Sequence, residues 1–428
     1  MSNVLMLSAI VMLVLLFFKV PVFIAVLGGS MVYFVMNPGI NTVIFAQQAI
    51  IGTEKISLMA IPFFVCAGIF MNYTGVTKRI MDFCEVVTGR LPGGLAQVNV
   101  LLSTVMGGLS GSNIADAAME SKMMVPEMTK KGFSLEFSSV VTAASSMITP
   151  LIPPGIAMIL YGCIANVSIG KLFISGFGVG GLLCVSMMIL VGVISKKRGY
   201  GLLTTEKLTW SKFWTALKPA ILPLLLPVII IGGIRIGIFT ATEAGAVAIL
   251  YAAFLGFIYH EMHIKDMIQG LKETVCTTAS IMLIVSAASV FSWILTKERI
   301  PQALTAWMLA NIHSKYVFLI VVNIFLLIVG MFIEGNASMI ILVPLLAPIA
   351  APYGINEIQF AMIYIFNNAI GALSPPMGTL MFVTCSITKC KTAAFIKEAV
   401  PFYILLIINL MLLTWVEPFT TFLVNLFY

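Results

Sequence analysis

The sequence predicts an all-α polytopic membrane protein built from two inverted-topology repeats. Hydrophobic residues make up 60% of the 428 positions and charged residues only 10%, with a mean hydropathy of +1.08. Soluble domains carry about 25% charged residues, and a helix of about 20 apolar residues crosses a bilayer. Apolar runs of that size recur along the whole chain, and polar interruptions inside them recur at one constant spacing. The first observation predicts the membrane class and the second predicts the repeats.

General properties exclude several other classes. The first apolar run, "VLMLSAIVMLVLLFF", has no basic stretch before it and no small-residue cleavage site, so we expect a retained helix and not a signal peptide. The seven cysteines are scattered, and Cys385 and Cys390, the closest pair, lack metal-site spacing, so neither disulfides nor zinc are expected. The net charge of +7 lies mostly in loops beside helices, which indicates membrane orientation and not nucleic-acid binding.

Eight segments are apolar and uninterrupted, and each is expected to form a full helix. The stretch "NTVIFAQQAIIGTEKI", which follows the second of them, is interpreted as a surface arm. The expected helices are 4–18, 20–36, 57–73, 172–194, 219–236, 240–259, 276–295 and 399–416.

Four further segments are apolar but interrupted. Segments 95–125 and 317–350 each contain two apolar arms of about 15 residues around a polar, glycine-containing tip; such arms are too short to span and predict re-entrant hairpins. Segments 135–163 and 357–387 are each interrupted by Pro-Pro, which predicts broken helices. A simple kink supported by neighbouring helices is the alternative for a single Pro-Pro.

The interruptions recur in register. Gly108 lies in the first tip and Gly330 immediately before the second, and Pro153-Pro154 corresponds to Pro375-Pro376; the two separations are equal (330 − 108 and 375 − 153). The same shift places the helix at 20–36 over one at 242–258. A single offset shared by a hairpin, a broken helix and a full helix indicates a duplication.

The expected organisation has three parts. Residues 1–194 form the first repeat and residues 219–428 form the second. Between them, 195–218 is predicted to be a cytoplasmic linker helix on the membrane surface, anchored by Trp210 and Trp214.

Lysine and arginine positions predict the orientation. With a periplasmic N-terminus and five crossings in each half, 18 of the 24 basic residues lie in the cytoplasm, which satisfies the positive-inside rule. Because five is odd, the second half enters from the opposite face, and the repeats are inverted. The six basic residues on the outside are Lys55, Lys171, Arg235, Lys297, Arg299 and Lys315.

The tips carry the expected chemistry. Residues 107–119 read "GGLSGSNIADAAM", and the second tip reads "EGNASM". Inverted repeats with broken helices place ligands near the bilayer midplane, where helix N-termini attract anions and C-termini or freed carbonyls suit cations. The hydroxyls and carbonyls of "SGSN" can therefore replace the water shell of a small hard ion.

Only three of the 17 acidic residues fall in segments predicted away from aqueous loops: Asp116, Glu243 and Glu334. An acid at bilayer depth costs about 2.5–3.5 kcal/mol, so each is a functional candidate. For Asp116 the alternative is a helix cap or a structural hydrogen bond, for Glu334 a tip that reaches water, and for Glu243 an ion pair with Arg235.

Five stretches resemble the large membrane subunit of the tripartite ATP-independent periplasmic (TRAP) transporters. They are "IPFFVCAGIFMNYTGV", "LPGGLAQVNVLLSTVMGGLSGSNIADAAM", "ITPLIPPGIAMILYG", "IGIFTATEAGAVA" and "GALSPPMGTLMF". The resemblance implies a sodium-driven importer of organic acids such as C4-dicarboxylates, sialic acid or other sugar acids, located in the bacterial inner membrane. It also implies an elevator motion, a soluble periplasmic binding protein and a small four-helix membrane subunit on a separate polypeptide.

The resemblance also assigns site residues, with Na⁺ as the coupling ion and no transition metal. Glu334 stands where the family often has aspartate, and Gly155 where many members have serine. The predicted sodium ligands are Ser110, Ser112, Asn113, Thr149, Gly335, Asn336, Ser374 and Thr379. The residues predicted to bind substrate or to couple it to sodium are Asp116, Glu334, Gly155 and Ser338.

Three alternatives remain at this point. A stand-alone sodium/dicarboxylate symporter of similar hairpin architecture would not need a binding protein. An intramembrane enzyme would use Asp116 and Glu334 as an acidic dyad, and a channel would conduct without a sodium gradient. The sequence contains no phosphate-binding loop, metalloprotease motif or nucleophile elbow, so we expect neither ATP hydrolysis nor an enzyme.

Overall fold

The computed structural model describes residues 3–18, 20–204 and 209–428, which form α-helices and short 3₁₀ turns without a β-strand. Seven of these helices are long and apolar enough to cross a membrane, and two bent pairs would raise the number to nine. Large apolar side chains lie exposed on their outer faces, as lipid contact requires. The predicted all-helical membrane architecture is confirmed.

The helices up to Arg198 are mostly short, and α10 is the longest of them. They are α1 (Asn3–Phe17), α2 (Val22–Met36), α3 (Val43–Ile51), η1 (Ile56–Met59), α4 (Ala60–Asn72), α5 (Val76–Thr88), α6 (Gly94–Ser110), α7 (Asn113–Lys130), α8 (Leu135–Ser145), η2 (Ser146–Leu151), α9 (Ile156–Ala165) and α10 (Ile169–Arg198).

The second part of the chain begins at Trp210 and contains the longest helix of the described residues, α13. Its helices are α11 (Trp210–Ile236), α12 (Ala241–Ile258), α13 (Ile264–Lys297), α14 (Ile300–Asn311), α15 (Lys315–Phe332), α16 (Gly335–Ala350), η3 (Ala351–Tyr353), α17 (Glu357–Leu373), α18 (Thr379–Thr388), α19 (Thr392–Trp415) and α20 (Pro418–Phe427).

All eight predicted full helices form, several of them longer than expected. The helix expected at 276–295 is the clearest case, because α13 already begins at Ile264. Helices α5, α14 and α20 had not been predicted. Each is only 10–13 residues long, too short to be recognised as a span from hydropathy.

The linker prediction for 195–218 needs correction. Residues 195–198 belong to the end of α10, Gly199 closes that helix with a φ of +71°, and α11 runs without a break from Trp210 to Ile236. Trp210 and Trp214 therefore lie on the first turns of a long helix and not on a separate surface helix; residues 205–208 lie outside the described part. Three prolines fit inside α11, as neighbouring helices permit in membranes.

Helix starts recur at the offset seen in the sequence. Helices α7 and α16 begin at that offset from each other (335 − 113), as do α8 and α17 (357 − 135). Helices α9 and α18, and likewise α10 and α19, begin one position further apart (379 − 156 and 392 − 169). Both Pro-Pro bonds, Pro153-Pro154 and Pro375-Pro376, are cis. The two halves of the chain thus share one order of elements.

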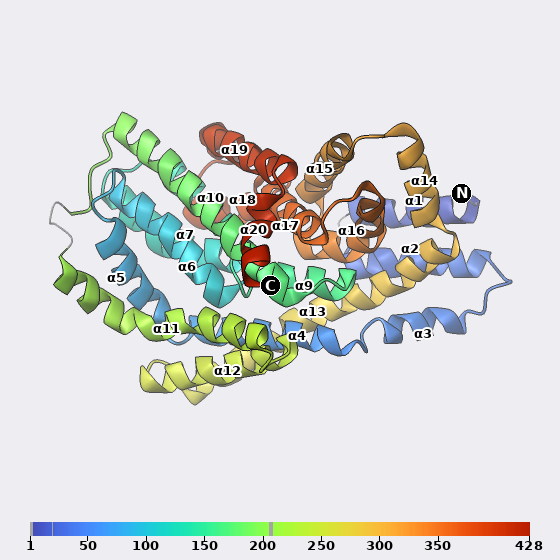
Figure 1. Ribbon diagram of the computed structural model, residues 1–428, viewed down its shortest axis with the longest axis horizontal. Helices are drawn as coiled ribbons and strands as arrows, with labels where there is room; N and C mark the ends of the chain where they lie inside the picture. Colours follow the sequence, from blue (N-terminus) through green and yellow to red (C-terminus); the bar gives the residue numbers. More distant parts are fainter. Residues whose placement is uncertain (1–2, 19, 205–208) are drawn as a thin grey trace.

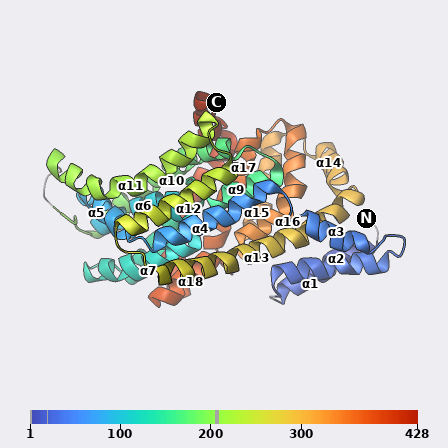
Figure 2. The same ribbon diagram turned by 90° about the horizontal axis from the view of Figure 1, so that it is seen from below.

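The two halves exchange helices in space. Helix α2 packs against α13 of the other half, and α12, which the offset matches with α2, packs against α4. Figures 1 and 2 show α1, α2 and α3 together at one end of the molecule, beside one end of the long helix α13. The sequence repeats are consequently not separate spatial domains.

The centre of the molecule is made of the short helices. In α17, residues 358–373 are all buried, and this helix contacts α15, α16, α18 and α19. The views in Figures 1 and 2 place α9 and α17 between the outer helices. The break before α9 is enclosed by protein, because residues 151–155 are buried, whereas Pro376 and Met377 at the break before α18 are exposed.

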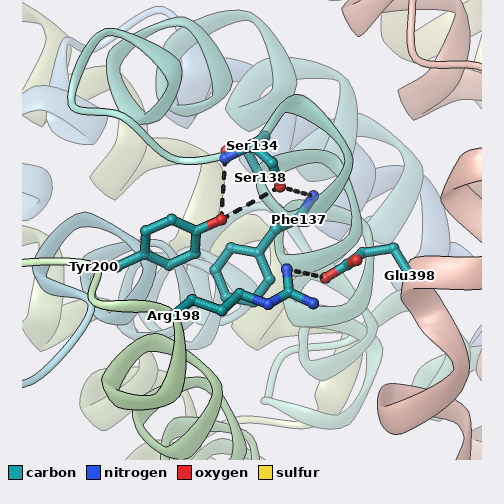
Figure 3. Close-up of polar contacts among 6 residues, drawn as sticks. All are labelled: Ser134, Phe137, Ser138, Arg198, Tyr200 and Glu398. Carbon is teal, nitrogen blue, oxygen red and sulfur yellow. Dashed lines mark hydrogen bonds and ion pairs between the residues drawn. The ribbon is translucent and has the colours of Figure 1, made fainter.

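A polar cluster joins the end of α10 to both α8 and α19 (Figure 3). The guanidinium of Arg198 lies 2.6 Å from the carboxylate of Glu398 and 5.4 Å from the centre of the Phe137 ring. The hydroxyl of Tyr200 accepts a hydrogen bond from the backbone N–H of Ser134. Burial raises the pKa of Tyr200, but its bonds to Ser134 and the nearby Arg198 charge outweigh burial and lower that pKa. The cluster fastens the first half to the second.

Candidate functional site

The first tip is a tight break between α6 and α7. Helix α6 ends at Ser110, and Gly111 turns the chain with a φ of +64°, a conformation that favours glycine. A Cβ at Gly111 would lie 2.9 Å from the carbonyl oxygen of Pro154. Ser112 then caps α7 by accepting a hydrogen bond from the N–H of Ala115. The predicted helix break is confirmed, and its tip lies against the first Pro-Pro segment.

Asp116 is the buried acid of this tip. It is 1% exposed, and its Oδ2 accepts a hydrogen bond of 2.8 Å from the hydroxyl of Thr149. It does not cap α7, because Ser112 has that role. No cationic side chain pairs with Asp116 among the described residues. Its surroundings therefore supply oxygens without a counter-charge, which suits a bound cation.

The second tip is built differently. Glu334 caps α16, and its carboxylate accepts a hydrogen bond of 3.0 Å from the N–H of Ala337. The amide of Asn368 donates to the carbonyl of Gly335 at 3.0 Å, which fixes the tip against α17. Ser338 is fully buried and lies 3.2 Å from the hydroxyl of Tyr364. The acid of the second tip thus has the capping role that serine has in the first.

A cavity of about 50 Å³ lies where the two tips meet, large enough for a few water molecules. Its lining includes residues from the first turns of four helices: Asn113 of α7, Ala157 of α9, Asn336 of α16 and Thr379 of α18. Each helix N-terminus presents unpaired N–H groups and a partial positive charge. Four of them converge on one small space.

The structure divides the predicted site residues into two groups. Asn113, Glu334, Gly335, Asn336 and Thr379 line the cavity. The others lie behind or beside it: Ser110, Ser112, Asp116, Thr149, Gly155, Ser338 and Ser374.

Two predicted residues have local structural roles. The hydroxyl of Ser374 donates to the carbonyl of Ile370 at 2.8 Å, so its hydrogen is used inside α17. Gly155 precedes α9, and a Cβ there would lie 2.5 Å from the carbonyl oxygen of Pro150. This close approach leaves little room for a side chain at position 155.

Glu243 is not part of the site. Its carboxylate accepts bonds from the backbone N–H and the hydroxyl of Thr240, which forms a capping box at the start of α12. Arg235 instead donates to the carbonyl of Phe427. The ion pair with Arg235, which was the alternative considered for Glu243, does not form. Glu243 has a structural role of another kind, as part of the cap of α12.

Two important polar residues were missed by the sequence reasoning. Asn368 lines the cavity from α17, and its Oδ1 has no partner among the described residues. Glu120 is completely buried on α7, four residues after Asp116. The dipeptide "NN" in the apolar run before the second Pro-Pro was a usable signal for Asn368. Glu120 was missed because this arm was expected to run into an aqueous loop.

Comparison with known proteins identifies the family. The family model described as "Tripartite ATP-independent periplasmic transporter, DctM component" matches residues 9–419. The chain belongs to this family. The sialic acid TRAP transporter large permease protein SiaM of Vibrio cholerae is 38% identical over 414 residues, which are 96% of each chain. The C4-dicarboxylate TRAP transporter large permease protein DctM of Pseudomonas aeruginosa is 36% identical over 365 residues, or 85% of each.

A solved structure supports the fold of this TRAP large subunit. The YdaH transporter of Alcanivorax borkumensis superposes with a TM-score of 0.60 at 15% sequence identity, covering 86% of this chain and 87% of its own. At that identity the likeness shows the fold alone. The TRAP relatives are transporter permeases, so the chain is a transporter subunit and not an enzyme.

Proposed function

We propose that this chain is the large membrane subunit of a sodium-coupled importer of organic acid anions in the bacterial inner membrane. The observation that carries the proposal is the convergence of four helix N-termini on one cavity between the two tips. A carboxylate bound there is stabilised by the N–H groups and the helix dipoles without a lysine or arginine. No lysine or arginine lines the cavity in the described part of the chain.

Sodium coupling is the second part of the proposal. Na⁺ is a hard cation that prefers oxygen ligands. Asp116, Thr149 and the end of α6 at Ser110 place carboxylate, hydroxyl and carbonyl oxygens directly behind the cavity. The α6 C-terminus carries partial negative charge, which adds to that of Asp116. A sodium ion held there neutralises the buried acid and favours an anion in the adjacent cavity.

The substrate class follows from the cavity and the relatives. Relatives of this chain are named for sialic acid, C4-dicarboxylate and 2,3-diketo-L-gulonate, all of them organic acids. The present space of about 50 Å³ is too small for any of them. The tips must therefore separate to admit substrate. We place the two halves in the membrane as inverted repeats with re-entrant tips and a periplasmic N-terminus, and we assign the opening to an elevator movement.

Partners complete the proposal. Family membership supports a small four-helix membrane subunit beside this chain and a soluble periplasmic protein that delivers the substrate. The stand-alone symporter is the competing function, and it differs in needing no binding protein. Uptake that persists when the binding protein is left out would favour the competitor.

The test is uptake into proteoliposomes that contain the chain, its small subunit and a matched binding protein. With an inward sodium gradient we expect accumulation of the organic acid, and without it we expect none. Asp116→Asn removes the buried charge while it preserves shape, so uptake should fall about tenfold or more. The control Glu243→Gln changes only an exposed cap and should transport normally. Undiminished uptake by well-folded Asp116→Asn would contradict the sodium site.

A further inference from the structure

Glu120 is a fully buried carboxyl group without a counter-charge. It lies on α7, at 0% exposure, and its Oε1 has no hydrogen-bond partner among the described residues. Helix α7 packs against α6, η2, α8 and α18, and these elements contain no lysine, arginine or histidine. Their titratable residues are Glu136 and Cys385, while Asp116 and Cys84 of α5 also face Glu120. The cationic residues of α7 itself, Lys122 and Lys130, are exposed.

A chain of hydrogen bonds leads away from this carboxyl group. The Oε2 of Glu120 lies 2.6 Å from the hydroxyl of Ser103, and that hydroxyl lies 2.8 Å from the hydroxyl of Ser145. The Ser145 hydroxyl in turn reaches the carbonyl of Thr142 at 3.1 Å and the side-chain oxygen of Asn99 at 3.5 Å. All five residues lie in the interior, on α6, α7 and α8.

The number of hydroxyl hydrogens available for these hydrogen bonds indicates which group carries a proton. A hydroxyl group donates one hydrogen bond, and the two groups beyond Ser145 can only accept. When Ser145 donates to them, it must accept from Ser103, which then has no hydrogen left for the carboxyl group. The bond between Ser103 and Glu120 is then donated by Glu120, which is the protonated acid. In the opposite order, Ser145 donates to Ser103 and Ser103 donates to an ionised Glu120. This leaves a buried charge with a single hydrogen bond and no cation, which costs several kcal/mol.

The other half of the chain shows that the fold does not need an acid at this position. The offset between the halves matches Glu120 with Leu342 of α16, Ser103 with Phe325 and Ser145 with Asn367. Leu342 packs against the hydrophobic core. An apolar side chain therefore fills the same position in the same order of elements. The acid and its serines are specific to the first half.

We propose that Glu120 is a proton-binding site between α6, α7 and α8, occupied in this conformation and acting as a pH-sensitive latch on the α6–α7 hairpin. Loss of the proton leaves a carboxylate four residues from Asp116, where two like charges repel. The arms must then loosen to admit water or a cation. The latch stands on its own hydrogen bonds and does not rest on the proposed sodium coupling.

Infrared spectroscopy of the full-length chain in lipid nanodiscs tests the site directly. At neutral pH the wild type should show the C=O stretch of a protonated carboxyl group that Glu120→Gln lacks. The control Glu127→Gln removes an exposed carboxylate paired with Lys130 and should change only the ionised-carboxylate bands. If the wild type and Glu120→Gln have the same C=O region while the carboxylate bands differ, Glu120 is ionised and the proposal is wrong.

Thermal unfolding tests the latch and covers the case in which one variant folds poorly. The folded chain holds a proton that an unfolded glutamate releases above a pH of about 4.3, so the folded state loses stability as pH rises. The unfolding temperature of the wild type should therefore fall as pH rises. Glu120→Gln and Glu120→Leu should not show this fall. Glu120→Leu copies Leu342, so it supplies a packed reference. The same pH dependence in all three proteins would overturn the latch.

Discussion

Two backbone crossings bring the tips against the broken helices. In the second half, a Cβ at Gly371 would lie 2.6 Å from the backbone of Gly330. In the first half, a Cβ at Gly107 would lie 2.8 Å from the Cα of Thr149, and the offset matches Thr149 with Gly371. Both tips are therefore positioned by helices that touch through their main chains. Small residues permit such close packing inside membranes.

The crossing of α15 and α17 gives a stability prediction. Gly371→Ala should push these helices apart and cost about 1–3 kcal/mol, because both contacting atoms belong to backbone. Thermal unfolding of the purified chain measures the loss. The control Gly181→Ala lies on α10 with nothing within 4 Å of its Cβ, so it should be neutral or slightly stabilising. Equal unfolding temperatures for Gly371→Ala and the wild type would contradict the close crossing.

At the scale of residues, the sequence identified the polar residues of the tips better than their hydrogen-bond partners. Asp116, Asn113 and Asn336 could be named because polar residues inside apolar runs are conspicuous. The bond from Thr149 to Asp116 spans 33 positions, and no local pattern could have paired them. The buried state of Glu120 likewise depends on the helices that surround α7.

At the scale of elements, the exchange of α2 and α12 between the halves determines how the halves hold together. The offset could be read from the sequence, but the exchange could not, because apolar helix faces do not specify their partners. The linker prediction was wrong for a related reason. Its tryptophans and lysines match a surface helix, yet the segment from Trp210 continues directly into the apolar part of α11.

The cluster in Figure 3 gives a prediction for the contact between α10 and α19. Glu398→Gln removes the charge that pairs with Arg198 while it keeps the size of the side chain. Because Arg198 is partly exposed, we expect a loss of about 1 kcal/mol or less in unfolding free energy, seen as a lower unfolding temperature. The more exposed pair of Lys130 and Glu127 offers the control, and Glu127→Gln should have no measurable effect. A loss of the same size in both variants would remove any special role of the cluster.

At the scale of the whole molecule, the class and the order of elements could be predicted from composition and from the offset. The direction of each half across the membrane still rests on the distribution of basic residues.

Side-specific labelling tests the inverted arrangement. Lys130→Cys places a thiol at the end of α7, and Lys315→Cys places one at the start of α15. In a background with the exposed Cys276 replaced, a membrane-impermeant maleimide should reach Lys130→Cys only from the cytoplasm and Lys315→Cys only from the periplasm. The cysteine-replaced parent is the control for background labelling. Labelling of both positions from the same side would show that the halves run in parallel.

The four helix starts at the cavity match in pairs by sequence offset, but the matched residues differ in chemistry. The shared offset matches Asn113 with Gly335, Ile114 with Asn336, and Ala157 with Thr379. A molecule held between them therefore meets an amide at different positions on the two flanks, and a hydroxyl group, that of Thr379, on only one of them. In the proposed cycle it keeps one orientation throughout its passage, so the end that enters first is also the end that leaves first.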